Sequence, residues 1–284
     1  LAGMVLALEA IVWSGAELSG DLMLISPGDG EAEFGSAFLM AEDGTVDDVD
    51  YIISGEPTGL DEIGVSYLGS SLWRVSVKGR SAHATQPEEG VNAIYQASQV
   101  IQAVEEGKLT FRHEPHPFFT PFGIVHGIRN KAQAEIPDEC TFIMIVFSVA
   151  GMTLSSIEED LNSFIGDLQG EIPDLEASVS LIPRETHMWL PPVDEPTDSP
   201  IVGAIQDAAK AIEGVDAEAT KMRIGYVPTA ATGSRMQGRD KRPVVVTYGP
   251  GDYRQAHSVD EEVSVEEVAK FAEIYANAAL SLVG

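Results

Sequence analysis

Hydrophobic positions in the first sixty residues predict helices and strands in the alternating order of an α/β domain. Residues 1–14 are apolar at helical spacing, which predicts a helix packed in a core. Short apolar runs follow at 21–25 and 51–53, and such runs are typical of buried strands. Strands that alternate with helices usually pair in a parallel, doubly wound sheet. This segment therefore predicts an α/β domain with a mostly parallel sheet.

The rhythm changes after residue 60. Apolar and polar residues alternate at 65–68 and 72–77 around a Gly-Ser-Ser turn, which predicts an antiparallel hairpin. The remaining elements predicted here are a helix at 92–106, strands at 122–126 and 140–149, a helix at 154–168 capped by Ser155 or Ser156, and a strand at 177–182. Their order predicts a compact α+β (ferredoxin-like) domain with its helices on one face of an antiparallel sheet. An exposed edge of that sheet could pair with a second subunit.

The α/β rhythm resumes after a linker rich in proline, threonine and acidic residues at 183–200. A helix, a strand and a helix are predicted at 201–212, 244–248 and 263–282. The second domain is therefore predicted to be an insertion in the first. We place the α/β domain at 1–62 and 184–284 and the inserted domain at 63–183.

Polar side chains in the turns after apolar strands are the candidate functional residues, because ligands bind an open α/β sheet at the ends of its strands. Glu56 lies in a Ser-Gly-Glu-Pro-Thr turn at 54–58, and His257 follows a Gly-Pro-Gly-Asp turn at 249–252. His83 lies in a loop at 79–94 punctuated by Gly, Ser and Pro.

Each of these residues also has a purely structural interpretation. Glu56 could be a solvated turn carboxylate, and His257 could be a helix-start histidine held by the acids after it. His83 could simply be held in its loop by Ser81 and Thr85. The residues alone leave both interpretations open.

Taken in order, the three segments resemble the zinc-dependent deacylase and peptidase family of acetylornithine deacetylase, succinyl-diaminopimelate desuccinylase and aminoacylase. The resemblance runs over nearly the whole chain. It implies two zinc ions (cobalt or manganese as substitutes) bridged by an aspartate, with a separate glutamate as general base. It places Glu56 and His257 among the metal ligands. It implies that His83, on a lid and dimerisation domain, donates a hydrogen bond to the oxyanion in the partner's site of a homodimer.

The same resemblance implies hydrolysis of the amide bond of an N-acyl amino acid or small peptide by metal-activated water. Arg235 resembles the family's contact to the substrate carboxylate, although the family's usual aspartate nearby is Gly233 here. Gly249 is expected to shape the backbone beside the substrate.

This sequence also departs from the family pattern. The segment 26–35 should carry a Glu-Glu pair (base and ligand), but none is present. Alignment without a gap puts Asp29 and Gly30 there, and a one-residue gap puts Gly30 and Glu31 there. Asp29 and Glu31 are therefore the candidates for the base, and Glu31 also for a metal ligand. Two substrate-contacting positions are changed, to Ala134 and Phe147.

The first residues resemble the helix that follows the family's Asp-x-Lys-Gly segment. We therefore expect a truncated or eroded copy that cannot hold two metal ions alone. The alternative is a catalytically inactive dimerisation or binding module of the same fold. A two-domain small-molecule binder of periplasmic type is a third hypothesis.

The composition of the chain indicates which classes of binding partner are disfavoured. The chain of 284 residues has 17 basic and 45 acidic residues and a formal net charge of −28. Such a charge disfavours nucleic acids and anionic membranes. No apolar run is long enough to span a bilayer. The single cysteine, Cys140, excludes an internal disulfide and a zinc site built from thiolates. We expect a cytoplasmic protein without nucleic-acid or membrane partners.

Overall fold

The structure is a computed structural model, and it describes residues 1–28, 35–130, 135–183, 189–212, 214–222 and 242–284. The chain forms two units. The first unit combines Leu1–Tyr67 with Pro192–Gly284, and the second unit is Leu68–Pro191. None of the helices in the described ranges is long and apolar enough to cross a bilayer.

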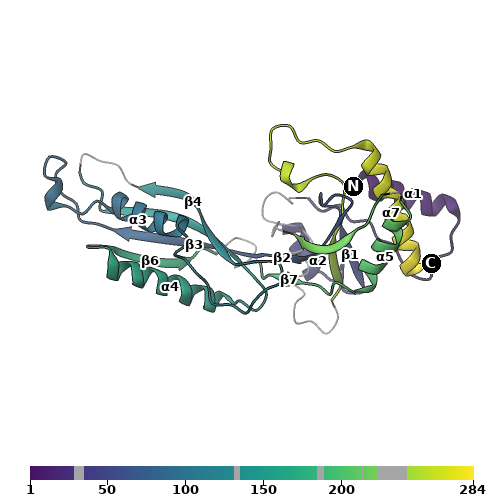
Figure 1. Ribbon diagram of the computed structural model, residues 1–284, viewed down its shortest axis with the longest axis horizontal. Coiled ribbons are helices and arrows are strands. Elements are labelled where there is room, and N and C mark those ends of the chain that lie inside the picture. The colour runs from purple at the N-terminus through teal and green to yellow at the C-terminus, as the bar shows by residue number, and fades with distance from the viewer. Residues whose placement is uncertain (29–34, 131–134, 184–188, 213, 223–241) are drawn as a thin grey trace. The chain divides into compact units, whose positions relative to one another are not determined.

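A mixed five-stranded sheet forms the centre of the first unit (Figure 1). Strand β1 (Tyr51–Ser54) pairs in parallel with β9 (Val244–Thr247). Strand β2 (Glu62–Tyr67) pairs in parallel with β8 (Glu218–Met222), and antiparallel with both β9 and the short β7 (Val193–Asp194). Early and late parts of the chain therefore build one sheet, which brings their turns together.

Helix α7 (Val265–Val283) packs against both α1 (Ala2–Ser14) and α5 (Pro200–Lys210). Its buried residues Phe271 and Ile274 join the core over the sheet. A further helix, α2 (Gly35–Glu42), belongs to the same unit. The helical pattern predicted at both ends of the sequence is confirmed.

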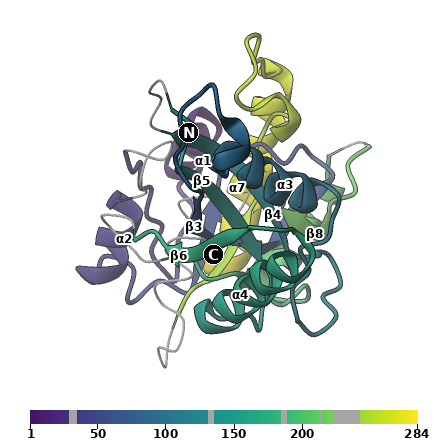
Figure 2. The same ribbon diagram turned by 90° about the vertical axis from the view of Figure 1, so that its left-hand side faces the viewer.

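The second unit is a four-stranded antiparallel sheet in the spatial order β4-β5-β3-β6. Its elements, in chain order, are β3 (Gly69–Lys78), α3 (Ala93–Glu105), β4 (Phe122–Asn130), β5 (Glu139–Ser148), α4 (Leu154–Glu171) and β6 (Glu176–Leu181). Figure 2 shows α3 and α4 beside these strands, and apolar residues of both helices share one core with the sheet. This βαββαβ order with split pairing is the predicted ferredoxin-like topology.

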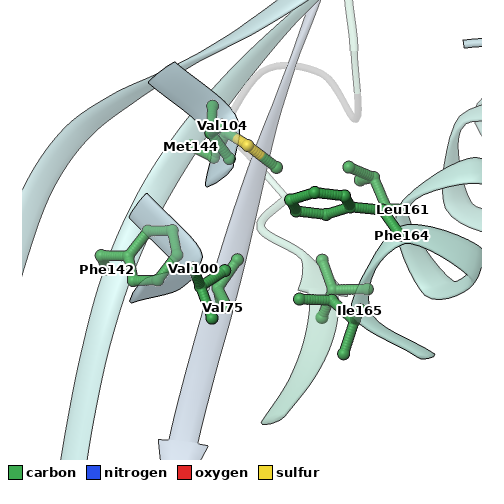
Figure 3. Close-up of a pocket in the computed structure, with 9 residues that line it drawn as sticks. Val75, Val100, Val104, Phe142, Met144, Leu161, Phe164 and Ile165 are labelled. Atoms are coloured by element: carbon green, nitrogen blue, oxygen red, sulfur yellow. The ribbon is translucent and has the colours of Figure 1, made fainter. Parts of the chain in front are cut away.

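One face of this sheet is dry because alternate residues of its strands are apolar. Cys140, Phe142, Met144 and Val146 of β5 are buried, and apolar residues of α3 and α4 cover them. The interior between the helices and the sheet is drawn in Figure 3 and has no room for a water molecule. It is lined by Val75, Val100, Val104, Phe142, Met144, Leu161, Phe164, Ile165 and Val179. This space is therefore packed core and no ligand site.

The predicted hairpin at 65–77 is wrong. Strand β2 lies in the sheet of the first unit, where it pairs on both sides, while β3 pairs with β5 and β6 in the second unit. The reason is burial, since five of the six β2 residues are buried and the strand thus faces protein on both sides. The chain passes from the first unit to the second after Tyr67. The boundary predicted from the sequence was after residue 62.

The strand predicted at 21–25 does not form, since these residues have no strand conformation. Met23 and Leu24 are 54% and 37% exposed, so this apolar run is not enclosed by neighbouring elements. A strand needs a partner strand for its backbone groups, and an apolar composition alone does not supply one.

Candidate functional site

The turns after β1 and β9 meet at one edge of the first sheet. The two strands are parallel neighbours with Ser54 opposite Thr247, so their turns leave the sheet at the same end. The backbone N–H groups of Thr58 and Gly59 donate to the Gly249 carbonyl at 3.0 and 3.1 Å. The Thr58 hydroxyl accepts the Gly249 N–H at 3.2 Å. The turn that carries Glu56 is thus bonded directly to the turn at 249–251.

Gly249 allows this approach because it has no side chain. A Cβ at this position would lie 2.5 Å from the carbonyl group of Gly55 and 2.6 Å from the carbonyl oxygen of Glu56. Real Cβ contacts do not reach such distances, so any other residue would push the two turns apart. Gly249 therefore sets the position of the Glu56 backbone.

The buried side chains of Tyr248 and Tyr275 stabilise the same turns through hydrogen bonds to backbone carbonyl groups. The Tyr248 hydroxyl donates to the Leu60 carbonyl at 2.8 Å, and the Tyr275 hydroxyl donates to the Tyr248 carbonyl at 2.5 Å. Burial raises the pKa of both tyrosines well above the ordinary value. Both groups therefore stay neutral donors and hold the turns rather than transfer protons.

His257 lies further along the same segment, after a short 3-10 helix at Tyr253–Gln255. Its backbone is left-handed, with φ of 63°, which is uncommon for a residue with a side chain. The carboxylate of Glu261 accepts the His257 backbone N–H, and Ser258 N–H donates to the Gln255 carbonyl at 3.0 Å. These bonds hold the exposed histidine in a conformation that costs free energy.

Asp252 begins this 3-10 helix. Its carboxylate accepts the Arg254 backbone N–H at 2.9 Å and the Arg254 Nε–H at 2.8 Å. The hydrogen bonds from Arg254 lower the pKa of Asp252 below its ordinary value. Asp252 is therefore ionised at neutral pH and fixed as a cap.

A cavity of about 660 Å³ lies beside the two turns within the first unit. It is lined by Thr58, Gly59, Leu60, Asp61, Glu62, Gly251, Asp252, Tyr253, Arg254, Gln255, Glu262, Val263, Ser264 and Glu267. Carboxylates outnumber the single guanidinium group on this lining. The volume suits a small molecule. Glu56 and His257 do not line the cavity, although Thr58 and Gln255, each two residues away along the chain, do.

The described residues do not assemble a metal site. No group of three or more His, Cys, Asp or Glu residues that could hold a metal ion occurs among them. Asp29, Glu31 and Arg235 lie outside the described residues, as does Ala134. Glu56 and His257 are donors of the types that zinc takes, but they fall short of a complete set. We therefore assign no chemical step to a metal ion. Cys140 is buried, and burial raises the pKa of its thiol.

His83 lies in the second unit, on a loop whose backbone is bonded at several points. Arg80 and Val91 exchange backbone hydrogen bonds of 2.9 and 2.8 Å. Ile136 N–H donates to the Ala82 carbonyl at 2.8 Å, next to a β-bridge between His83 and Glu135. The exposed imidazole is therefore carried by a firmly held backbone.

Phe147 of β5 is one of the two positions where the sequence departs from the substrate-contacting residues of the family resemblance. Its ring stacks on Phe122 of β4, with ring centroids 4.8 Å apart. The pair is thus an apolar contact between neighbouring strands.

The sequence predicted no role for Thr58 or Tyr248, which hold the two turns, whereas Thr85 was expected there only as a residue that could hold His83 in its loop. Thr58 lies in the Ser-Gly-Glu-Pro-Thr turn at 54–58, two residues after Glu56, so the sequence could have indicated it as a residue that stabilises this turn. A buried tyrosine next to a glycine turn gives no comparable pattern.

Residues 1–281 match the model of Peptidase family M20/M25/M40. Acetylornithine deacetylase from Myxococcus xanthus is 26% identical over 277 residues, which cover 94% of this chain and 67% of the relative. A probable succinyl-diaminopimelate desuccinylase from Staphylococcus aureus (strain N315) is 25% identical, over 92% of this chain and 67% of the relative. The match to acetylornithine deacetylase from Photorhabdus laumondii covers 61% of that protein. The chain thus spans about two thirds of the length of these relatives.

Two solved structures are similar in fold. Aminopeptidase PepT from Bacillus cereus ATCC 10987 superposes with a TM-score of 0.72 at 18% identity, over 99% of this chain and 70% of that chain. The Bacillus subtilis YXEP protein, described as a dinuclear metal-binding peptidase, superposes with a TM-score of 0.67 at 16% identity, over 99% and 70% of the two chains. These likenesses confirm the predicted fold class.

Proposed function

The chain belongs to the peptidase family M20/M25/M40, and from this premise we propose that it hydrolyses the amide bond of an N-acyl amino acid or small peptide. The observation that carries the proposal is the direct bonding of the Glu56 turn to the Gly249 turn beside a cavity of about 660 Å³. Carboxylate and imidazole side chains on turns at the ends of parallel strands suit a site of this kind.

The proposed roles of individual residues follow from their chemistry. Glu56 and His257 offer the donors that zinc accepts, and cobalt or manganese are substitutes. Asp29 or Glu31 would serve as general base, with Glu31 as the alternative further ligand. Arg235 would bind the substrate carboxylate. His83 of a second copy would donate a hydrogen bond to the developing oxyanion.

A homodimer through the second unit is part of the proposal. Strand β4 is an edge of its sheet, and Phe122, Ile124 and Ile128 on it are 43%, 43% and 53% exposed. Residues 122–130 contain no acidic residue in a chain of net charge −28. This edge can therefore approach a second copy without the repulsion expected elsewhere. A cytoplasmic location completes the proposal.

The test is hydrolysis of a panel of N-acyl amino acids and dipeptides by this chain, with zinc, cobalt or manganese added. We expect release of free amine, lowered by about 100-fold or more in Glu56→Gln and His257→Asn, since removing a catalytic group typically costs that much. Glu171→Gln, an exposed carboxylate at the end of α4, is the matched control and should keep full activity. Equal activity in all four proteins would contradict the proposed roles.

The second candidate is an inactive binding or dimerisation module of the same fold. It is favoured by the segment 26–35, which lacks the adjacent glutamates that supply a base and a ligand in the resemblance. Calorimetric titration with zinc separates the candidates. Two tight sites would contradict the module and the expectation from the sequence that the chain cannot hold two metal ions, whereas fewer than two tight sites together with no hydrolysis would contradict the hydrolase.

A further inference from the structure

We propose that Thr85 is a positioning residue for His83, which holds the neutral imidazole in the tautomer that carries its proton on Nε2. The inference rests on the proposed function, in which His83 serves as a hydrogen-bond donor. The loop pattern offered Thr85 only as a residue that could hold His83 in place, and neither that pattern nor the family resemblance says which ring nitrogen carries the proton.

Two contacts to Nδ1 of His83 carry this inference. The Thr85 hydroxyl oxygen lies 2.8 Å from Nδ1, and the Thr85 backbone N–H donates to the same nitrogen at 3.3 Å. A backbone N–H can only donate, so Nδ1 must present its lone pair. In the neutral ring the proton is then on Nε2. The Thr85 hydroxyl, which can donate or accept, acts as a second donor here.

The loop holds both residues at a fixed separation. Gln86 N–H donates to the His83 carbonyl at 2.8 Å, which closes a turn around Thr85. On the other side, the Ala82 carbonyl is held by Ile136. The loop base is closed by Gly79, where a Cβ would lie 2.1 Å from the Val91 carbonyl oxygen. The imidazole cannot turn over without losing both contacts to Thr85.

The neighbouring carboxylate has another partner. Glu135, opposite His83 in the backbone bridge, accepts a hydrogen bond from the Ser81 hydroxyl at 3.2 Å. All hydrogen bonds that the structure describes for the ring of His83 go to Nδ1 and come from Thr85.

The tautomer matters because it decides whether the imidazole attracts or repels an anion. With the proton on Nε2, the side of the ring opposite Thr85 is a donor that stabilises a developing oxyanion. With the proton on Nδ1, that side presents a lone pair and repels it. Thr85 would thus act on the reaction through His83, without touching the substrate itself.

The test is ¹⁵N NMR of the histidine side chains at about pH 8, where an ordinary histidine is neutral. The variant His83→Gln assigns the His83 signals. We expect wild type and Thr85→Ser to show the Nε2–H tautomer in large excess. Thr85→Val keeps the shape and the backbone N–H but lacks the hydroxyl, and we expect it to raise the Nδ1–H population several-fold. Ser81→Ala, which removes a hydroxyl bonded to Glu135 in the same loop, should match wild type.

A proton on Nδ1 in the wild type, or a tautomer ratio in Thr85→Val equal to that of wild type, overturns the inference. The spectra need no turnover, so this outcome is independent of the proposed hydrolysis. Where hydrolysis is observed, Thr85→Val should lower kcat several-fold at constant KM, with Thr85→Ser restoring it. An inactive chain with the expected tautomers would remove the proposed function and leave the Thr85 contact in place.

Discussion

Arg242 and Glu195 form an ion pair inside the first unit. Nη1 and Nη2 of Arg242 donate to the two carboxylate oxygens at 2.5 and 3.1 Å. The Glu195 side chain is 1% exposed and that of Arg242 is 29% exposed. The carboxylate also accepts the Val245 N–H of β9 at 3.4 Å. A charge withdrawn this far from water depends on its partner.

We expect Arg242→Met to lower the free energy of unfolding by about 3–5 kcal/mol, because it leaves the Glu195 charge buried and unpaired. Lys78→Met is the matched control, since Lys78 and Glu176 form an ion pair with 70% and 69% exposed side chains. Its loss should cost less than about 1 kcal/mol. Urea denaturation measures both, and equal losses would show that burial does not set the contribution of the pair.

The sequence predicts some site residues better than others at this scale. Glu56 and Gly249 each lie two residues beyond the end of an apolar strand, so their place is set once β1 and β9 pair in parallel. His257 lies eight residues beyond Gly249 in a segment without periodicity, and its left-handed backbone has no signal in the pattern. Asp29, Glu31 and Arg235 stay predictions.

Helix α4 starts with a reciprocal cap. The Thr153 hydroxyl accepts the Ser156 N–H at 3.1 Å, and the Ser156 hydroxyl accepts the Thr153 N–H at 3.0 Å. The helix begins at Leu154 as predicted, but the sequence placed the cap at Ser155 or Ser156, whereas Thr153 is the N-cap and Ser156 is the second half of the capping pair. Such pairs satisfy two backbone donors at once.

We expect Thr153→Ala to lower the free energy of unfolding by about 1 kcal/mol, the usual loss for an N-cap. Ser155→Ala, one residue into the helix and exposed, is the control and should have little effect. Thermal unfolding followed by circular dichroism measures both. A larger loss at Ser155 would contradict the assignment of the cap.

Most helices and strands could be predicted from periodicity, because burial on one face leaves a regular pattern, as in β5 and α3. Strand β2 could not be assigned to its sheet in this way. Its partners β7, β8 and β9 come more than a hundred residues later, and local alternation contains no information about them. Long-range pairing is thus the part of this fold that a local pattern misses.

The net charge of −28 acts on the molecule as a whole. Like charges repel more strongly in the compact state than in the unfolded chain, which lowers stability at low ionic strength. The exposed ion pairs are too few to offset an excess of this size, since the chain has 17 basic residues for 45 acidic ones.

Raising sodium chloride from about 0.01 M to about 1 M shortens the Debye length from about 30 Å to about 3 Å. We expect the urea midpoint to rise as this repulsion is screened. Potassium chloride should act equally, because screening depends on ionic strength, whereas sucrose tests for exclusion from the surface. A midpoint that falls with salt would show that attractive pairs outweigh the repulsion.

The absence of a side chain at Gly249 has a consequence for recombining this protein with its relatives. The turn at 55–59 and the turn at 249–251 fit at one point where only backbone atoms can lie. A chimera that exchanges one turn alone would keep half of a matched interface. Chimeras of homologues should therefore exchange the two turns together, although about 190 codons separate them in the gene.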